Sequence, residues 1–171
     1  MKRLLPLLWL FALPALAPGG GKSPGLSVSF HAEGDEFEGQ RMVRADPEKG
    51  PDGKKHFFRI SPVVTNKNFK GFAVFPADDG SFGAAFKLDN SGWESLLQTA
   101  AIDSGKLMRV IVNGRPVDFL RIDKPRRNDH TIVVWKGLSE EDVKALRAKY
   151  KELGAPPPDE ASSRRRPDEG E

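Results

Sequence analysis

The longest apolar run in the chain lies at its extreme N-terminus, where it is not available to a folded core. Lys2 and Arg3 precede a run from Leu4 to Leu16, and Ala15-Leu16-Ala17 ends the run with small residues. A basic start, a short apolar run and a small-x-small end are the layout of a secretory signal peptide. The run is shorter than the roughly 20 apolar residues that cross a bilayer. We therefore expect this segment to be removed and the fold to be built from the residues after it.

Two cleavage positions remain open. Pro18 follows Ala17 directly, and proline just after the scissile bond is a poor substrate, so cleavage after Gly19 is the alternative. We place the signal peptide at residues 1–19 and a flexible Gly/Pro/Ser-rich leader at residues 20–25. The rest of the chain contains no second long apolar run. We expect an exported protein, periplasmic or extracellular, with no membrane span in its mature form.

The chain contains no cysteine, so an exported product has no disulfides and depends on a hydrophobic core. Loss of Lys2 and Arg3 lowers the Lys plus Arg count from 27 to 25, against 24 acidic residues. The mature chain is therefore nearly neutral, so its computed pI does not indicate a nucleic-acid-binding protein, which would need a clustered basic face. Residues 26–153 are expected to form a single domain. Residues 154–171, with three consecutive prolines and no aliphatic side chain larger than alanine, are expected to be a disordered tail.

Strand signals recur through the expected domain. Leu26, Val28 and Phe30 alternate with serines, which is typical of a half-buried strand. Asp78-Asp79-Gly80 and Asn113-Gly114 are hairpin turn signals, and Pro76 places the strand before the first turn at an edge or bulge. The predicted strands are residues 26–30, 40–44 as the hairpin partner of the first, 56–60, 71–75, 82–88, 107–112, 117–122, and 131–135 as a central strand covered on both faces.

Two helices are predicted. Ser91 to Glu94 has the spacing of a capping box and begins a helix that Gly105 ends. Ser139 to Asp142 begins a second helix, which Gly154 ends. The order of elements predicts an α+β fold, in which a mainly antiparallel sheet has the two helices packed on one face. The apolar stripe of the second helix consists of Val143, Leu146, Tyr150 and Leu153.

Three segments, together covering roughly residues 58–157, share their motifs with a known family. They read ISPVVTNKNFKGFAVFPADDGSFGAAFKLDNSGWESL, SGKLMRVIVNGRPVD and HTIVVWKGLSEEDVKALRAKYKELGAPPP. Their strands, turns and helix caps resemble the head region of the first periplasmic domain of SecD, the accessory subunit of the bacterial protein-export machinery. The chain looks like a stand-alone relative of that head.

The resemblance implies a SecD-like fold and a head that meets extended or unfolded polypeptide. SecD also has transmembrane helices, whose charged residues serve proton-driven export, and no such helices are expected in this chain. The motor role therefore does not carry over. The family has no catalytic residues in this region, so the resemblance implies no enzymatic site.

The residues themselves offer no clear site for a metal, a cofactor or catalysis. His31, His56 and His130 lie far apart without the spacing of metal ligands. The acidic positions of Asp78 to Ser81 do not follow the alternate-residue pattern of a calcium loop, so a turn is the better interpretation. No nucleophile-plus-base motif stands out. We expect no cofactor and no bound metal.

One local basic cluster comes after the Asn-Gly turn and consists of Arg115, Arg121, Lys124, Arg126 and Arg127. Two interpretations remain open. The cluster is either a solvated hairpin tip or a contact surface for acidic polypeptide or anionic headgroups, because clustered charge steers partners of the opposite sign.

Two classes of function are compatible with these observations. The favoured hypothesis is an exported, non-enzymatic accessory or binding module that contacts unfolded or extended polypeptide or an envelope protein. The alternative is a small secreted hydrolase whose site the sequence does not reveal. An exposed aromatic groove beside a sheet edge would support the first, and a pocket that gathers a histidine, a carboxylate and a hydroxyl would support the second. The apolar periodic settings of Trp93 and Trp135 favour core positions over a ligand platform.

Overall fold

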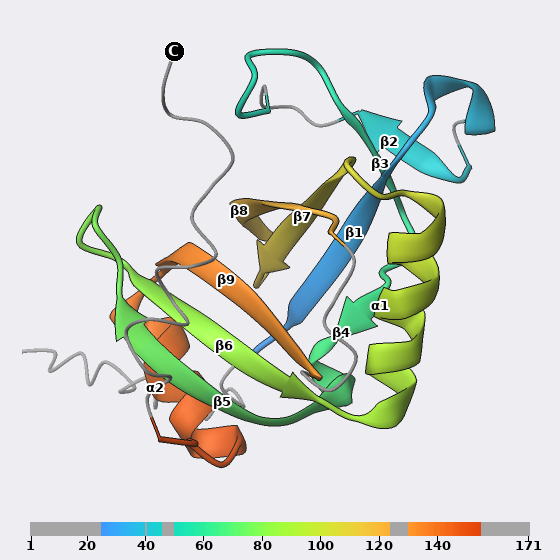
Figure 1. The fold of residues 1–171 in the computed structure, drawn as a ribbon. Coiled ribbons are helices and arrows are strands. Elements are labelled where there is room, and N and C mark those ends of the chain that lie inside the picture. The colour runs from blue at the N-terminus through green and yellow to red at the C-terminus, as the bar shows by residue number, and fades with distance from the viewer. Residues whose placement is uncertain (1–24, 40, 46–49, 124–129, 155–171) are drawn as a thin grey trace, which may run out of the picture.

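The computed structural model of the protein describes residues 25–39, 41–45, 50–123 and 130–154 (Figure 1). The predicted signal peptide lies outside these residues, as do most of the predicted leader and tail. Within the described part, no helix has both the length and the apolar character needed to cross a membrane.

The strands that the structure describes form two antiparallel sheets. The larger sheet has the order β2-β3-β1-β7-β8, with β4 added beside β1. Its strand β1 shows the predicted alternation, because every second residue is buried. The α+β class predicted from the sequence is confirmed, with the strands divided between two sheets. The larger sheet consists of β1 (Val28–Gly34), β2 (Val43–Ala45), β3 (Phe57–Arg59), β4 (Val64–Thr65), β7 (Leu107–Val112) and β8 (Arg115–Arg121).

The smaller sheet contains β5 (Phe69–Pro76), β6 (Phe82–Leu88) and β9 (Thr131–Leu138) in the order β5-β6-β9. The predicted hairpin of β5 and β6 is confirmed, and β5 lies at the end of its sheet as Pro76 indicated. The prediction of a central strand at residues 131–135 is wrong. Among the described strands, β9 pairs only with β6, and only alternate residues of its first half are buried.

The pairing predicted for residues 40–44 is also wrong. β2 pairs with β3 and not with β1. The physical reason is that both sides of β1 are already occupied, by β7 on one side and by β3 and β4 on the other. The short strand β4 was not predicted. It is followed by a 3-10 turn, η2 (Asn66–Asn68), and a similar turn, η1 (Glu36–Glu38), follows β1.

The first helix, α1 (Asn90–Ile102), begins earlier than predicted. The Asp89 carboxylate accepts the Gly92 N–H at 2.7 Å, so Asp89 and not Ser91 is the N-cap. Trp93, Leu96 and Ala100 face the core from this helix.

The second helix, α2 (Glu140–Lys149), begins as predicted with a capping box. The Ser139 hydroxyl accepts the Asp142 N–H at 3.1 Å, and the Asp142 carboxylate accepts the Ser139 N–H at 3.0 Å. The helix ends before the predicted Gly154, because Tyr150 adopts an extended backbone conformation. Leu153 therefore leaves the helical stripe and joins the edge of β5.

One hydrophobic cluster joins the two sheets and both helices. Figure 1 shows α1 along the side of the molecule next to β4, and α2 behind the smaller sheet. Phe30 of the larger sheet packs edge-on against Phe69 and Phe86 of the smaller one, at centroid distances of 6.3 and 6.4 Å. Leu146 of α2 belongs to the same cluster and is completely buried.

The two sheets meet where β8 lies beside β9. The Trp135 N–H donates to the Asp118 carboxylate at 2.8 Å, in place of a backbone ladder between the strands. Gly137 has a positive φ of 87°, and a Cβ there would lie 2.5 Å from the Val117 carbonyl oxygen. Glycine at this position therefore allows the two strands to approach closely.

Candidate binding edge

The three histidines lie in separate environments. His31 contacts Ser29 and the Arg59 carbonyl, His56 lies between two carboxylates, and His130 stacks on Trp93 at 5.0 Å. Among the described residues, no group of three or more His, Cys, Asp or Glu side chains could hold a metal ion.

His31 and Ser29 form the contact most similar to a catalytic pair. The Ser29 hydroxyl lies 2.9 Å from Nε2 of His31, and Nδ1 lies 2.8 Å from the Arg59 carbonyl oxygen. Burial and the charge of Arg109 lower the pKa of His31, although the hydrogen bond to Arg59 opposes them. The His31 ring links Ser29 of β1 to the Arg59 carbonyl of β3, so the pair joins these two strands.

His56 is held by Glu33 and Asp52. Its Nδ1 lies 2.5 Å from a Glu33 oxygen, and its Nε2 lies 2.7 Å from an Asp52 oxygen. Burial acts to lower the pKa of His56, but the two hydrogen-bonded carboxylates raise it overall. The His56 ring ties the loop before β3 to β1, because Asp52 belongs to that loop and Glu33 belongs to β1. Glu33 also accepts the Leu107 N–H.

The structure does not bring the described members of the predicted basic cluster together. Arg115 and Arg121 are the first and last residues of β8, so they lie at opposite ends of the strand. The Arg115 guanidinium donates to Asp142 of α2 at 3.0 Å, which makes it part of the contact between this hairpin and α2. Arg121 is exposed. Lys124, Arg126 and Arg127 lie outside the described residues.

The outer edge of β5 pairs with a segment from the end of the chain. The Phe72 N–H donates to the Lys151 carbonyl at 3.1 Å, and the Leu153 N–H donates to the Phe72 carbonyl at 2.6 Å. These bonds form a single parallel bridge between Phe72 and Glu152. The edge of β5 therefore binds an extended backbone by main-chain hydrogen bonds, which is the geometry of strand addition.

The pairing stops after this one bridge. Backbone groups of a strand face alternate sides, so the next residue whose N–H and C=O face the same edge is Val74. No backbone bond joins Val74 to Leu153 or to any other part of the described chain beyond the strand ladder. Pro76, two residues further along, offers only a carbonyl. The edge from Val74 to Pro76 can therefore accept a short extended segment.

An aromatic pair lies beside this part of the edge, which pairs with no other described residue. Phe75 of β5 and Trp135 of β9 make an edge-to-face contact, with ring centroids 6.0 Å apart. They meet across Gly83 of β6, where a Cβ would collide with the Phe75 ring and would lie 2.6 Å from the Trp135 carbonyl oxygen. Both rings are half-buried. Trp135 is therefore neither a fully buried core residue nor a free platform.

The outer face of the smaller sheet is lined by small side chains. Phe72, Ala84 and Val134 point into the core, so their neighbours point to the opposite face. Ala73 pairs with Ala85 on that face, and both are nearly buried. With Gly71 and Gly83, these two alanines form an apolar floor of small residues next to the rings of Phe75 and Trp135. We call this floor and the adjoining edge the β5 site. It comprises the outer edge of Val74–Pro76 and the residues Gly71, Ala73, Phe75, Gly83, Ala85 and Trp135.

Arg147 and Glu152 hold the bound segment in place. The Arg147 guanidinium donates to both oxygens of Glu152, at 3.0 and 3.2 Å, and this pairing lowers the pKa of that carboxyl. Both side chains are exposed, so the pair fixes geometry more than it adds stability. Leu153 packs against Gly71, at a distance of 3.0 Å from the position of a Cβ.

Sequence reasoning found the β5 edge but missed the segment that lies on it. Pro76 signalled an edge strand, and the hairpin turn fixed its partner. The bridge at Glu152 could not be found in this way, because Tyr150 and Leu153 continue the apolar periodicity of α2 and conceal the end of the helix. The Phe75–Trp135 contact joins residues far apart in sequence. The available signals were Gly71 and Gly83, because a glycine inside a strand often marks a place where another part of the chain approaches closely.

No protein-family model matches this chain, and no curated protein matches it. Two solved structures of SecDF have a similar fold. One, in the super-membrane-facing form, gives a TM-score of 0.47 and 16% identity, over 71% of this chain and 18% of that chain. The other, described as a membrane component that enhances protein export, gives 0.46 and 13%, over 70% of this chain and 60% of that chain. This protein thus spans less than two thirds of either chain, and these values do not assign it to a family.

Proposed function

We propose that the mature protein is an exported, non-enzymatic module that binds an extended polypeptide segment at the β5 site. The observation that carries the proposal is that this edge already binds an extended segment, residues 151–153, through the backbone of Phe72. Val74 offers the next pair of backbone groups in the same direction. The N-terminal layout of Lys2 to Ala17 supports export.

Main-chain hydrogen bonds supply an affinity that does not depend on the peptide sequence. Side-chain contacts with the neighbouring face of the sheet supply the preference for particular peptide sequences. A peptide at Val74 places alternate side chains over Phe75 and Trp135, next to the low floor of Ala73 and Ala85. Apolar side chains suit this surface, because the half-buried Phe75 and Trp135 rings offer contact area. We expect weak binding, since only a short length of edge is free.

The test uses the single N–H group that the proposal requires. Val74→Pro removes the N–H that faces the edge and leaves the bonds to β6 in place, as proline is tolerated on edge strands. Val74→Ala is the matched control, because it shortens the same side chain but keeps the N–H. In a titration with an unfolded polypeptide, followed by Trp fluorescence or NMR, binding should be lost in the proline variant and kept in the alanine variant. Equal binding by both variants would contradict the proposal.

Export, the preference for acidic partners and the absence of turnover are each tested separately. N-terminal sequencing of the protein recovered outside the cytoplasm should give a start between residues 18 and 21, whereas an intact Met1 on a cytoplasmic species would exclude export. The preference for acidic partners predicted from Lys124, Arg126 and Arg127 is tested by repeating the titration at about 0.1 and 1 M salt, where the Debye length falls from about 10 to about 3 Å. A preference for acidic polypeptide should fade at the higher salt concentration.

The alternative, a secreted hydrolase, has one specific observation in its favour. Ser29 and His31 are in hydrogen-bond contact. A panel of ester, glycoside and phosphate substrates should show no turnover. Turnover that disappears in Ser29→Ala would establish the hydrolase instead.

A further inference from the structure

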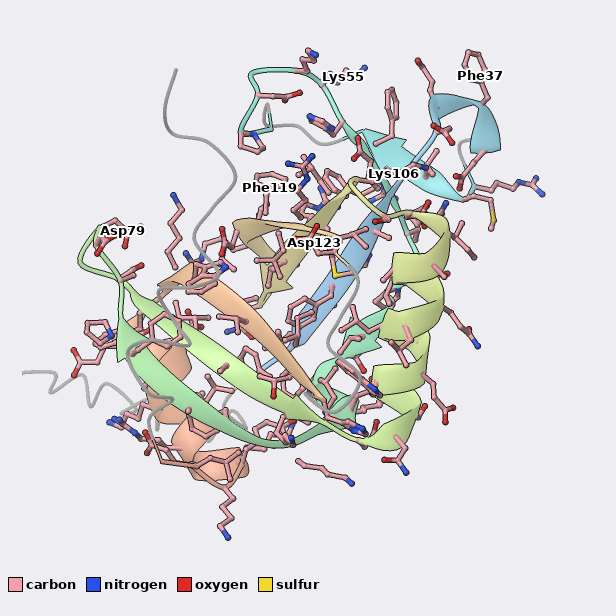
Figure 2. The ribbon with its side chains drawn as sticks, viewed as in Figure 1. Phe37, Lys55, Asp79, Lys106, Phe119 and Asp123 are labelled. Atoms are coloured by element: carbon pink, nitrogen blue, oxygen red, sulfur yellow. The ribbon has the colours of Figure 1, made fainter. Side chains whose placement is uncertain are left out.

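The β5 site already has an occupant that belongs to the same chain. We call residues 151–153 the strap, because they lie across the outer edge of β5 and use both edge-facing backbone groups of Phe72. The open part of the edge continues from Val74 toward the turn between β5 and β6, where Figure 2 shows Asp79. A peptide limited to this open part pairs over a short distance. A longer peptide must take the groups of Phe72 as well.

The contacts that hold the strap lie at the surface. Each of its residues is exposed. Two backbone hydrogen bonds join it to Phe72, and the exposed pair of Arg147 and Glu152 connects it to the end of α2. Leu153 packs on Gly71. A segment that is exposed and held by surface contacts belongs to the part of a structure that opens at low free-energy cost.

The residue before the strap is anchored separately. The Tyr150 hydroxyl donates to the Asn66 carbonyl at 2.7 Å and accepts the Asn66 side-chain amide at 3.2 Å. The Tyr150 ring also lies edge-on to Phe69, with ring centroids 5.8 Å apart. Its backbone N–H donates to the Leu146 carbonyl at 2.8 Å and closes the last turn of α2. None of these contacts involves the strap, so the strap can leave the edge while α2 and Tyr150 stay in place.

The strap also shows how a peptide would lie on this edge. It runs parallel to β5, and the Leu153 side chain lies over Gly71, 3.0 Å from the position of a Cβ. The Lys151 carbonyl oxygen lies 2.9 Å from the same position, so glycine allows the added backbone to approach closely. A peptide that replaces the strap in the same direction places an aliphatic side chain over Gly71 and continues past Val74.

We propose that the strap is an autoinhibitory pseudo-ligand, which a polypeptide longer than the open edge displaces. This inference rests on the proposed function, since it concerns the regulation of the same site. Phe72 offers one N–H and one C=O to the edge, so the strap and the peptide cannot both form a ladder with it. Displacement gives the peptide the groups of Phe72 and Val74 together. If the strap leaves the edge for about 10% of the time, the apparent affinity for such a peptide is lower by about tenfold.

The first test is amide hydrogen exchange of the mature protein, followed by NMR, with and without a capped, uncharged peptide of alternating serine and leucine. In the free protein, Phe72 and Leu153 both donate their N–H groups. In the complex, the Leu153 amide should lose its protection because the strap has left. The Phe72 amide should keep its protection because the peptide replaces the strap. A Leu153 amide that stays protected would show that the peptide binds beside the strap, which would overturn the inference and leave the proposed function intact.

Charge reversal at Arg147 and Glu152 tests the inference by affinity. Arg147→Glu and Glu152→Arg each bring like charges together, so each should loosen the strap. Each should tighten binding of the uncharged peptide about two- to fivefold, the range for an exposed ion pair. The double variant restores opposite charges and should return to wild-type affinity. The single changes alter the net charge in opposite directions, so a gain common to both cannot come from net charge. Equal affinities of wild type and all these variants would overturn the inference.

Two truncations give the larger effect. Truncation after Tyr150 removes the strap and keeps its anchor, so binding of the peptide should tighten about tenfold. Truncation after Ala155 keeps the strap and is the control. Val74→Pro and Val74→Ala, titrated with the same peptide, separate the two proposals. If Val74→Pro abolishes binding while removal of the strap changes nothing, the β5 site stands and autoinhibition fails. If the two Val74 variants bind equally, the proposed function fails, and the inference with it.

Discussion

The β5 site and the ion-pair network around Arg59 differ in what holds them together. At the β5 site, backbone hydrogen bonds and apolar contacts fix the edge, and the ion pair of Arg147 and Glu152 is exposed. In the network around Arg59, a buried carboxylate, Asp103, connects β3 and α1 through charge. We therefore expect the stability of the smaller sheet to depend mainly on packing. The stability of the larger sheet should depend also on pH and on its charged side chains.

The largest effect is expected from removing packing under the smaller sheet. Leu146→Ala should cost roughly 2–5 kcal/mol, because the side chain is completely buried between α2 and the core. Urea unfolding gives the value. Lys144→Ala, at an exposed position of the same helix, should change stability by less than about 0.5 kcal/mol. If Leu146→Ala cost less than about 0.5 kcal/mol, α2 would lie on the surface. The smaller sheet would then not depend on packing, and the comparison of the two regions would fail.

A smaller but pH-dependent effect is expected at Asp103. Asp103→Ala should cost roughly 1–3 kcal/mol, because Lys106 and Arg59 lose a buried partner while Arg59 keeps Glu38. Burial acts to raise the pKa of Asp103, but hydrogen bonds from Arg59 and Lys106 lower it below 3.8 overall. The contribution is therefore complete above that pH and is lost as the pH falls below it. Urea unfolding of wild type and variant at pH 7 and pH 3 should show their difference shrinking at the lower pH.

His56 should give a weaker effect of opposite sign. Its pKa is raised above 6.5 by Asp52 and Glu33, although burial opposes them. The stabilisation is thus complete below pH 6.5 and is lost as the pH rises through the pKa of the folded state. His56→Gln should flatten the dependence of unfolding free energy on pH between pH 6 and 9. A steeper dependence in the variant would show that another group controls this range.

The smallest effect is expected from removing the end of the chain. Truncation after Ala155 should change Tm by less than about 2 °C, because the removed residues have no large apolar side chain. Truncation after Lys149 is the contrasting variant. It removes Tyr150, the bridge to Phe72 and the Leu153 contact, so its Tm should fall further. Equal Tm values for both truncations would show that the bridge adds no stability.

The sequence predicted the parts of the fold that depend on local signals. The Asn113-Gly114 turn, with φ values of 51° and 79°, closes the β7–β8 hairpin as expected, and Ser139 caps α2. The errors arose where residues far apart in the sequence determine how the strands pair. Residues 132–135 are uniformly apolar, yet β9 lies at the end of its sheet because β8 approaches it through Asp118 rather than through a backbone ladder.

The candidate site was only partly predictable for the same reason. Pro76 marked the edge, but neither residues 151–153 nor Trp135 could be placed beside it from spacing alone. The charged residues of the network around Arg59 come from β3, η1 and the end of α1, and no local pattern links them. The predicted basic cluster stays a prediction: Arg115 and Arg121 lie at opposite ends of β8, and its other three members lie outside the described residues.

The segment that covers part of the β5 edge also has a consequence for solubility. The strand reads FKGFAVFP, and an open edge of this composition is a template for aggregation. Lys70 and Pro76 mark its two ends, and residues 151–153 occupy the middle. A protease that cut after Lys149 would expose the stretch between them. A protein that has lost the residues after Lys149 would then precipitate before it unfolds.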